Sequence, residues 1–309
     1  MKQIAQAGLF DESSRHARFL ELLVRNDTNS ETIKSALTQL LNYADSVEGL
    51  YLQLAFGSGC WDTLNPSWRP KDLVPFSDLS AGDLNMPSSQ GDILIWLHSS
   101  DSELIPQALI MIYQTMETVA DIQLDLEGIK NKESRDLIGF VDGTANPKDD
   151  QRIAAALIST EELGAGGSYV ISQRWQHDLA AFNQLSINAQ EKVVGRTKID
   201  DIELEGADMP EDSHVSRTDA KVDGKAMKIY RRSSPYMSSQ LEKKIKPDHG
   251  LYFFAFASEM QRFSVQLERM MGLSSDGVSD KLMKYSAAKT GSYWFMPSKI
   301  DLTNVLKIN

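Results

Sequence analysis

Apolar and polar positions along this chain alternate in short stretches that predict a mixture of strands and helices. Stretches that alternate with period two, or are briefly all apolar, predict strands over residues 51–56, 91–98, 121–127, 168–175, 250–257 and 292–296. Apolar residues spaced three or four apart predict helices over residues 12–24, 30–45, 103–118, 149–156, 178–185, 187–194, 258–271 and 278–285. Asn29 or Ser30 is a suitable N-cap for the second of these helices. Residues 57–89 and 198–205 are expected to be irregular.

The order of these elements indicates the fold class. Strands and helices follow one another without regular strand–helix–strand alternation, which favours an α+β fold with antiparallel sheets. The two halves are similar in organisation but not in sequence. A division near Pro147 gives two predicted domains, residues 1–147 and 148–309.

Composition and charge exclude some classes of partner. The 309 residues are 41% hydrophobic and 24% charged, which is typical of a globular protein in water. A net charge of -11 argues against a general nucleic-acid binder and against a protein that binds anionic membranes. The basic cluster at residues 243–246 (KKIK) is expected to be a solvated loop.

The number of cysteines and the lengths of the apolar runs indicate the cellular compartment in which the protein is expected. Cys60 is the single cysteine, so neither an intramolecular disulfide nor a thiolate metal cluster can form. The first residues lack the pattern of a secretory signal, and no apolar run has the length of a membrane span. We therefore expect a cytoplasmic protein.

The stretch from Ile138 to Pro147 (IGFVDGTANP) is the first candidate for chemistry. It places Asp142 between a Phe-Val pair and Gly143, and glycine permits close approaches that a Cβ would prevent. The carboxylate could thus face something flat and apolar. A tight Asp-Gly turn that joins two elements is the simpler interpretation of this stretch alone.

Histidine offers a second candidate. The five histidines have no zinc-site spacing, and four of them are expected to be structural or solvated: His16, His98, His177 and His249. His214 lies in the polar stretch EDSHVSR. A single histidine can ligate haem iron, which needs only one axial nitrogen and a pocket, although most loop histidines are surface residues.

A third candidate is the pair Arg231-Arg232 before the turn Ser233-Ser234-Pro235. Two adjacent arginines here are commonly partners of surface carboxylates. Alternatively, one guanidinium points inward, where its permanent charge can stabilise a developing anion.

Together these stretches resemble the dye-decolourising peroxidases, a family of haem enzymes. GFVDG matches the GxxDG motif of the family, and VGRTK, SHVSRTD, KIYRRSSPY, GLYFFAFA and SDKLMKYSAAKTGSYWFMPS follow in the family's order. The resemblance covers nearly the whole chain, is strongest over residues 138–298, and points to the bacterial cytoplasmic branch. It implies two ferredoxin-like domains of the dimeric α+β barrel type, with haem b in the C-terminal half.

The resemblance also implies roles for individual residues. His214 would be the proximal ligand of the iron, and Asp280 would accept a hydrogen bond from it, which orients the ring and strengthens its donation. Asp142 and Arg231 would be the distal catalytic pair. The remaining residues expected at the cofactor are Gly143, Thr144, Arg196 and Ser233. One departure is that Ser216 stands two positions after the histidine, where many members have arginine, and Arg217 follows.

The function that follows is a haem peroxidase that uses H2O2 to oxidise phenolic or dye-like donors. Its partners would be H2O2 and small aromatic reductants, with no nucleic acid and no membrane, in a homo-oligomer. There are three alternatives: a haem-binding or haem-trafficking protein, another haem enzyme that releases iron from haem or acts on chlorite, and a haem-free structural domain. The haem carrier needs His214 and Asp280 but does not need Asp142 with Arg231, and on the family pattern the distal aspartate disfavours chlorite chemistry.

Overall fold

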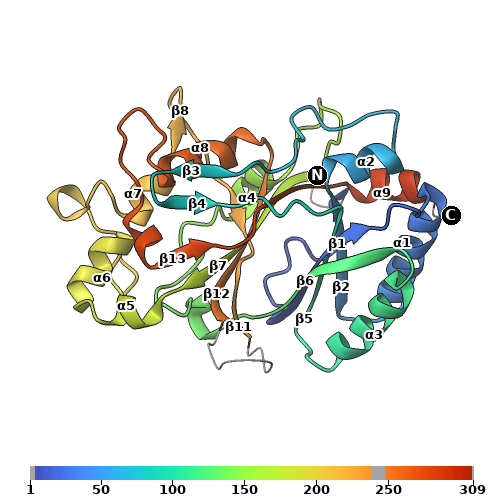
Figure 1. Ribbon diagram of the computed structural model, residues 1–309, viewed down its shortest axis with the longest axis horizontal. Coiled ribbons are helices and arrows are strands. Elements are labelled where there is room, and N and C mark those ends of the chain that lie inside the picture. The colour runs from blue at the N-terminus through green and yellow to red at the C-terminus, as the bar shows by residue number, and fades with distance from the viewer. Residues whose placement is uncertain (1–3, 239–247, 308–309) are drawn as a thin grey trace.

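One antiparallel sheet runs through both halves of the chain (Figure 1). The structure is a computed structural model, and it describes residues 4–238 and 248–307. The strand order is β10-β12-β7-β14-β2-β5-β1-β6, and β11 and β13 pair with β12 and β7. The strands of the first half are β1 (His16–Val24), β2 (Leu50–Phe56), β3 (Leu79–Ala81), β4 (Leu84–Met86), β5 (Ile93–Ser99) and β6 (Ala120–Ile129). Those of the second half are β7 (Ser168–His177), β8 (Lys221–Val222), β9 (Lys225–Ala226), β10 (Tyr230–Arg231), β11 (Ser234–Ser238), β12 (Asp248–Ala257), β13 (Ser286–Ala288) and β14 (Ser292–Met296).

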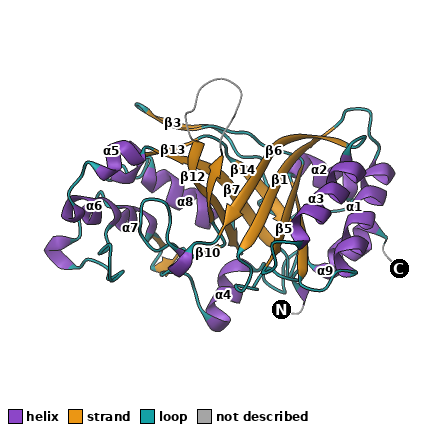
Figure 2. Cartoon of the chain, turned by 90° about the horizontal axis from the view of Figure 1, so that it is seen from below, coloured by secondary structure: helices purple, strands orange, loops and turns teal. Residues whose placement is uncertain are grey.

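Helices cover the two ends of this sheet (Figure 2). The α-helices are α1 (Ser30–Asp45), α2 (Ser58–Leu64), α3 (Leu104–Met116), α4 (Asp149–Ala156), α5 (Leu179–Asn183), α6 (Ile187–Val194), α7 (His214–Thr218), α8 (Gln261–Met270) and α9 (Lys299–Leu306). Both views place α1, α3 and α9 at one end and α5, α6 and α7 at the other, with the strands between them. None of the described helices is long and apolar enough to cross a membrane.

The two ferredoxin-like halves meet around an aromatic layer. β14 pairs with β2 through Phe295 and Phe56, and on the other side β6 lies beside β11. Glycine is needed at that second junction, because a Cβ on Gly128 would lie 2.6 Å from the Ser234 Cβ. The sheet thus curves around a buried layer formed by Phe19, Trp96, Tyr230, Tyr252, Phe254, Phe256 and Trp294. The predicted α+β class with antiparallel sheets is confirmed. The division after Pro147 stays a prediction.

The strongest helix prediction is confirmed. Helix α1 begins after Asn29, whose side chain accepts a hydrogen bond from the Thr32 amide at 2.9 Å and so satisfies one free donor of the first turn. Its apolar stripe packs on the sheet through Ile33, Ala36, Leu37, Leu40 and Ala44.

The helix expected over residues 12–24 is wrong, because His16–Val24 is strand β1. β1 pairs with both β5 and β6, and both of its faces are buried: Leu20 and Leu22 face one core, and Ala17 and Phe19 face the other. A strand covered on both faces loses its alternation, so its apolar residues fall at helical spacing by chance.

Three further expectations need correction or extension. Residues 278–285 do not form an α-helix but a 3-10 turn (Lys281–Lys284) followed by β13. The segment 57–89, expected to be irregular, contains α2 and the β3–β4 hairpin. Helices α7 and α9 were not predicted from the pattern, since one has only five residues and the other lies near the chain end. The basic cluster at residues 243–246 lies outside the described residues.

A buried carboxyl group joins the two halves inside the aromatic layer. Glu21 of β1 is 1% exposed, and its Oε1 accepts hydrogen bonds from Ser172 Oγ of β7 at 2.8 Å and from Tyr252 OH of β12 at 2.7 Å. Trp294 Nε1 in turn donates to Ser172 Oγ at 2.9 Å. Burial raises the pKa of Glu21, against a smaller opposing effect of these hydrogen bonds. Burial therefore favours the protonated form of Glu21 more in the folded protein than in the unfolded chain.

Glu21→Gln is expected to raise Tm at pH 8 by about 2–4 °C. A carboxyl with a raised pKa in the fold contributes stability fully below its ordinary pKa, and this contribution is lost as the pH rises through the folded value. Glutamine keeps the shape and the hydrogen bonds but has no such pH dependence. Thermal unfolding from pH 5 to pH 8 measures the effect, and the advantage of the variant should shrink towards pH 5. An advantage that is constant over this range would contradict the assignment.

Candidate active site

A cavity lined by many apolar side chains lies between the sheet and the helices of the second half. Apolar walls with a few polar groups are typical of cofactor sites. Alternate residues of β7 face it, because successive side chains of a strand point to opposite faces. Most of the wall is apolar, formed by Ile171, Trp175, Ile229, Leu251, Phe253, Phe263, Leu267, Met270, Leu282 and Met283.

His214 enters this cavity from the first residue of α7. The helix starts there because Ser213 is its N-cap and accepts a hydrogen bond from the Ser216 amide. His214 Nδ1 lies 2.6 Å from Asp280 Oδ2. Asp280 is fully buried, and its second oxygen accepts from the Leu282 amide at 2.8 Å.

This contact fixes the tautomer of His214. An ionised carboxylate only accepts hydrogen bonds, so the ring proton of neutral His214 lies on Nδ1. Nε2 then carries a lone pair, and the side chain is 31% exposed at the cavity. A metal ion in the cavity would find one imidazole ligand, already oriented by a carboxylate.

Asp142 and Arg231 also line this cavity, and the two side chains are paired. Arg231 Nε lies 3.4 Å from Asp142 Oδ1, and Nε is buried without a hydrogen-bond partner among the described residues. Asn146 holds the backbone of Arg231 from both sides: its Nδ2 donates to the Arg231 carbonyl at 2.8 Å, and its Oδ1 accepts from the Arg231 amide at 2.9 Å. The same loop that carries Asp142 therefore also places Arg231.

A small hairpin positions Asp142. The Asp142 amide donates to the Ser134 carbonyl at 2.9 Å, and Arg135 forms a β-bridge with Val141. The turn of this hairpin needs Gly139, whose φ is +91° and where a Cβ would lie 2.6 Å from Lys198 Cε. The stretch at residues 138–147 is thus a tight turn that also presents a carboxylate to a cavity.

The hairpin is fastened to β7 by a pair that the sequence did not reveal. Asp136 Oδ2 lies 3.0 Å from His177 Nε2, and both side chains are more than 90% buried at the cavity wall. Ser286 Oγ lies 2.8 Å from His177 Nδ1. The signal was present, because His177 continues the alternation of Ile171 and Trp175 along β7, but it was interpreted as a helix start.

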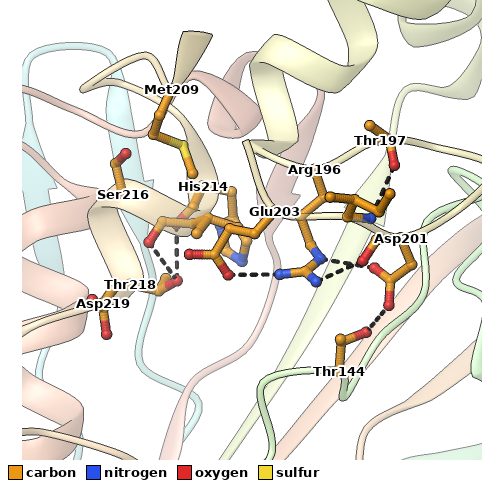
Figure 3. A network of polar contacts seen from close by, with 12 residues as sticks. Thr144, Arg196, Thr197, Asp201, Glu203, Met209, His214, Ser216, Thr218 and Asp219 are labelled. Carbon is orange, nitrogen blue, oxygen red and sulfur yellow. Dashed lines mark hydrogen bonds and ion pairs between the residues drawn. The ribbon is translucent and has the colours of Figure 1, made fainter. Parts of the chain in front are cut away.

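The other expected cofactor residues lie around the cavity rather than in its wall. Arg196 is held by Asp201 (Nε to Oδ1, 2.7 Å) and Glu203 (Nη1 to Oε2, 2.8 Å), and Thr144 is bonded to Asp201. Figure 3 shows this network beside His214, where Thr144, Arg196 and Glu203 line a side opening of the site.

Gly143, Ser233 and Arg217 have other positions. Gly143 and Ser233 line a second hollow, which meets the main cavity at Asp142 and Arg231. Arg217, which follows the departure at Ser216, does not line the main cavity. Its guanidinium is buried against Asp276, Ser274 and the carbonyl of Arg269.

Comparison with known families identifies this arrangement. A family model described as Dyp-type peroxidase, C-terminal, matches residues 133–301, and one described as Dyp-type peroxidase, N-terminal, matches residues 6–130. The chain belongs to the Dyp-type peroxidase family. The match to the C-terminal model contains every residue discussed at the cavity, from Asp136 to Ser286.

Individual members of the family are similar over most of their length. The chain is 32% identical over 267 residues to a dye-decolorizing peroxidase of Mycobacterium tuberculosis, covering 85% of this chain and 78% of that protein. A Dyp-type peroxidase of Shewanella oneidensis superposes with a TM-score of 0.89 at 30% identity, covering 99% and 98% of the two chains. A DypB variant of Rhodococcus jostii, solved in complex with haem, superposes with a TM-score of 0.86 at 30% identity, covering 96% and 97%.

Proposed function

We propose that this protein is a haem-b peroxidase that uses H2O2 to oxidise phenolic or dye-like donors. The observation that carries the proposal is that two polar pairs, His214 with Asp280 and Asp142 with Arg231, line the same cavity. The first pair suits an iron ligand, and the second suits proton transfer and charge stabilisation. A haem carrier needs only the first pair.

The residues of the cavity fit haem. A flat, largely apolar macrocycle matches walls built from Trp175, Phe253 and Phe263. Nε2 of His214 offers the single axial nitrogen that haem iron requires. Among the described residues, the buried Nε of Arg231 has no hydrogen-bond acceptor, and a molecule bound in the cavity could supply one. We propose that His214, oriented by Asp280, would ligate the iron, with Thr144, Gly143, Arg196 and Ser233 around the cofactor.

Bound haem would supply the redox chemistry, and the protein supplies protons and electrostatics. Each H2O2 takes up two electrons and two protons and gives two molecules of water. Asp142 accepts a proton from the entering peroxide and returns it to the oxygen that departs. Arg231, 3.4 Å away, is permanently charged and stabilises negative charge on that oxygen as the O–O bond breaks.

Turnover with a phenolic donor tests this proposal. The haem-loaded protein should oxidise the phenol only in the presence of H2O2, with the rate proportional to bound haem. Free haem at the same concentration, without the protein, is the control. A loaded protein no faster than free haem would reject the peroxidase function.

Asp280→Asn is expected to weaken haem binding by roughly 10–100-fold. An asparagine amide cannot accept from both His214 Nδ1 and the Leu282 amide, because one of its two positions is now a donor. If the amide group faces His214, the ring proton moves to Nε2 and the lone pair is lost from the cavity. Haem titration followed by absorbance measures the affinity. Asp45→Asn, an exposed residue at the end of α1, makes the same charge change and should have no effect.

The cellular compartment, the reductants and the oligomeric state also belong to the proposal. The single cysteine suits a reducing environment, and we propose that the protein is cytoplasmic. Small aromatic molecules are the proposed reductants, and a homo-oligomer stays a prediction.

A further inference from the structure

The second hollow, which we call the vestibule, opens where the two halves of the chain meet. Its wall includes Arg15, Trp96, Lys130, Asp142, Arg231 and Arg232. Asp142 and Arg231 belong to both hollows, so a molecule in the vestibule lies next to the distal pair. The first three residues lie in the match to the N-terminal family model, and the last three lie in the match to the C-terminal one. No single stretch of sequence reveals it.

The vestibule contains three cationic side chains for which the described residues show no direct ion pair. Within the described residues, Arg15, Lys130 and Arg232 have no carboxylate oxygen within 4.0 Å. Arg232 Nη1 instead donates to the carbonyl of Leu9 at 2.7 Å. In a chain of net charge -11, three cationic side chains without a direct ion pair at one hollow are a local excess of positive charge.

The acidic residues of the vestibule are already engaged or lie at its edge. Glu12 Oε1 accepts from Tyr230 OH at 2.8 Å and pairs with Arg152 at 3.4 Å. Asp142 pairs with Arg231, and Asp149 is exposed at the rim. Burial and the nearby charge of Arg232 lower the pKa of Lys130, against an opposing effect of the Glu12 and Asp142 carboxylates.

A buried donor at the same wall is also without a partner. Trp96 is 2% exposed, and its Nε1 has no hydrogen-bond partner among the described residues. The guanidinium carbon of Arg232 lies 4.9 Å from the centre of the Trp96 ring. Buried donors are normally satisfied, so an unpaired indole N–H at a cationic hollow indicates a missing acceptor.

We propose that the vestibule binds the carboxylate of a small aromatic acid. Lys130, Arg15 and Arg232 supply the charge, and the indole N–H of Trp96 supplies a directed hydrogen bond. The rings of Pro147 and Pro235 in the wall give the organic part an apolar surface, which an inorganic anion would not use. This site goes beyond the peroxidase function and does not require haem.

Calorimetric titration with benzoate, and with its neutral analogue benzamide, tests the site. Benzoate should bind one per chain to the haem-loaded protein and to the haem-free chain, and benzamide should bind at least about tenfold more weakly. Sulfate should bind more weakly than benzoate. Lys130→Gln and Arg15→Gln should each weaken benzoate about fivefold. Lys71→Gln, an exposed residue outside the vestibule, makes the same charge change and should leave the affinity unchanged.

Trp96→Phe distinguishes a specific hydrogen bond at this site from a general attraction of benzoate to positive charge. Phenylalanine keeps an aromatic surface but removes the N–H, so benzoate affinity should fall about threefold to tenfold at unchanged net charge. Thermal unfolding of each variant confirms that it is folded.

Several results would overturn the proposal. Among them are equal affinities for benzoate and benzamide, tighter binding of sulfate, and affinity that Lys130→Gln does not change. Binding seen only in the haem-loaded protein, together with a shifted Soret band, would place benzoate on the iron instead. Because the haem-free chain is titrated too, failure of the peroxidase function would leave this test intact.

Discussion

The double variant Asp142→Ala, Arg231→Ala is expected to bind haem like the wild type but to react with H2O2 about 10²–10⁴ times more slowly. Neither residue is proposed to ligate the iron, so the Soret band before peroxide should keep the shape of the wild type. The variant removes both the proton acceptor and the permanent charge next to it, which lie 3.4 Å apart. Stopped-flow absorbance in the Soret region gives the second-order rate constant.

A matched pair elsewhere serves as the control for that experiment. Asp121 and Arg25 form an exposed ion pair of 2.9 Å in the N-terminal half, and neither residue lines the cavity or the vestibule. Asp121→Ala, Arg25→Ala should react with peroxide at the rate of the wild type. The single variants Asp142→Ala and Arg231→Ala then show which residue matters more. Wild-type rates in the double variant would rule out the distal assignment and favour a haem carrier.

His214→Ala is expected to lose haem affinity by more than the roughly 10–100-fold that removal of an outer partner such as Asp280 costs. The described part of the cavity contains a second histidine, His177, but its Nε2 lies 3.0 Å from Asp136 and its Nδ1 lies 2.8 Å from Ser286. It is therefore held by its neighbours and does not replace His214. Haem titration and the Soret spectrum measure both affinity and ligation.

Added imidazole gives this prediction a sharper test. The alanine variant leaves space next to Asp280 for a free imidazole, whose N–H can donate to the same carboxylate. Millimolar imidazole should restore the wild-type spectrum in His214→Ala but not in a His214→Ala, Asp280→Ala double variant. His249→Ala, on β12 and outside the cavity wall, should bind haem normally. Unchanged haem affinity in His214→Ala would contradict its role as ligand.

The hydrophobic pattern predicted most elements of the fold where one face is exposed. Helix α1 and strand β6 each have a solvent side, so polar residues mark their period. Strand β1 was predicted as a helix because its polar residues His16, Arg18 and Glu21 do not keep a strict alternation and its buried apolar residues also fit helical spacing. The pairing of β14 with β2 joins residues more than two hundred positions apart, and no local pattern predicts it.

The family resemblance predicted more of the candidate site than the positions of its residues along the sequence did. His214 and Asp280 are 66 positions apart, and nothing in the local sequence of either indicates a contact. The resemblance named both residues, and the structure brings them to 2.6 Å. It gave no indication of Asp136 and His177, which lie outside the motifs used for it.

The measurement that tests the central claim most directly is a Soret titration of the haem-loaded wild-type protein with one equivalent of H2O2. The account predicts a fast and complete spectral change, followed by a return to the starting spectrum when a phenol is added. Haem that is bound through His214 but reacts no faster than free haem would contradict it. The cavity would then bind haem without supporting peroxidase activity.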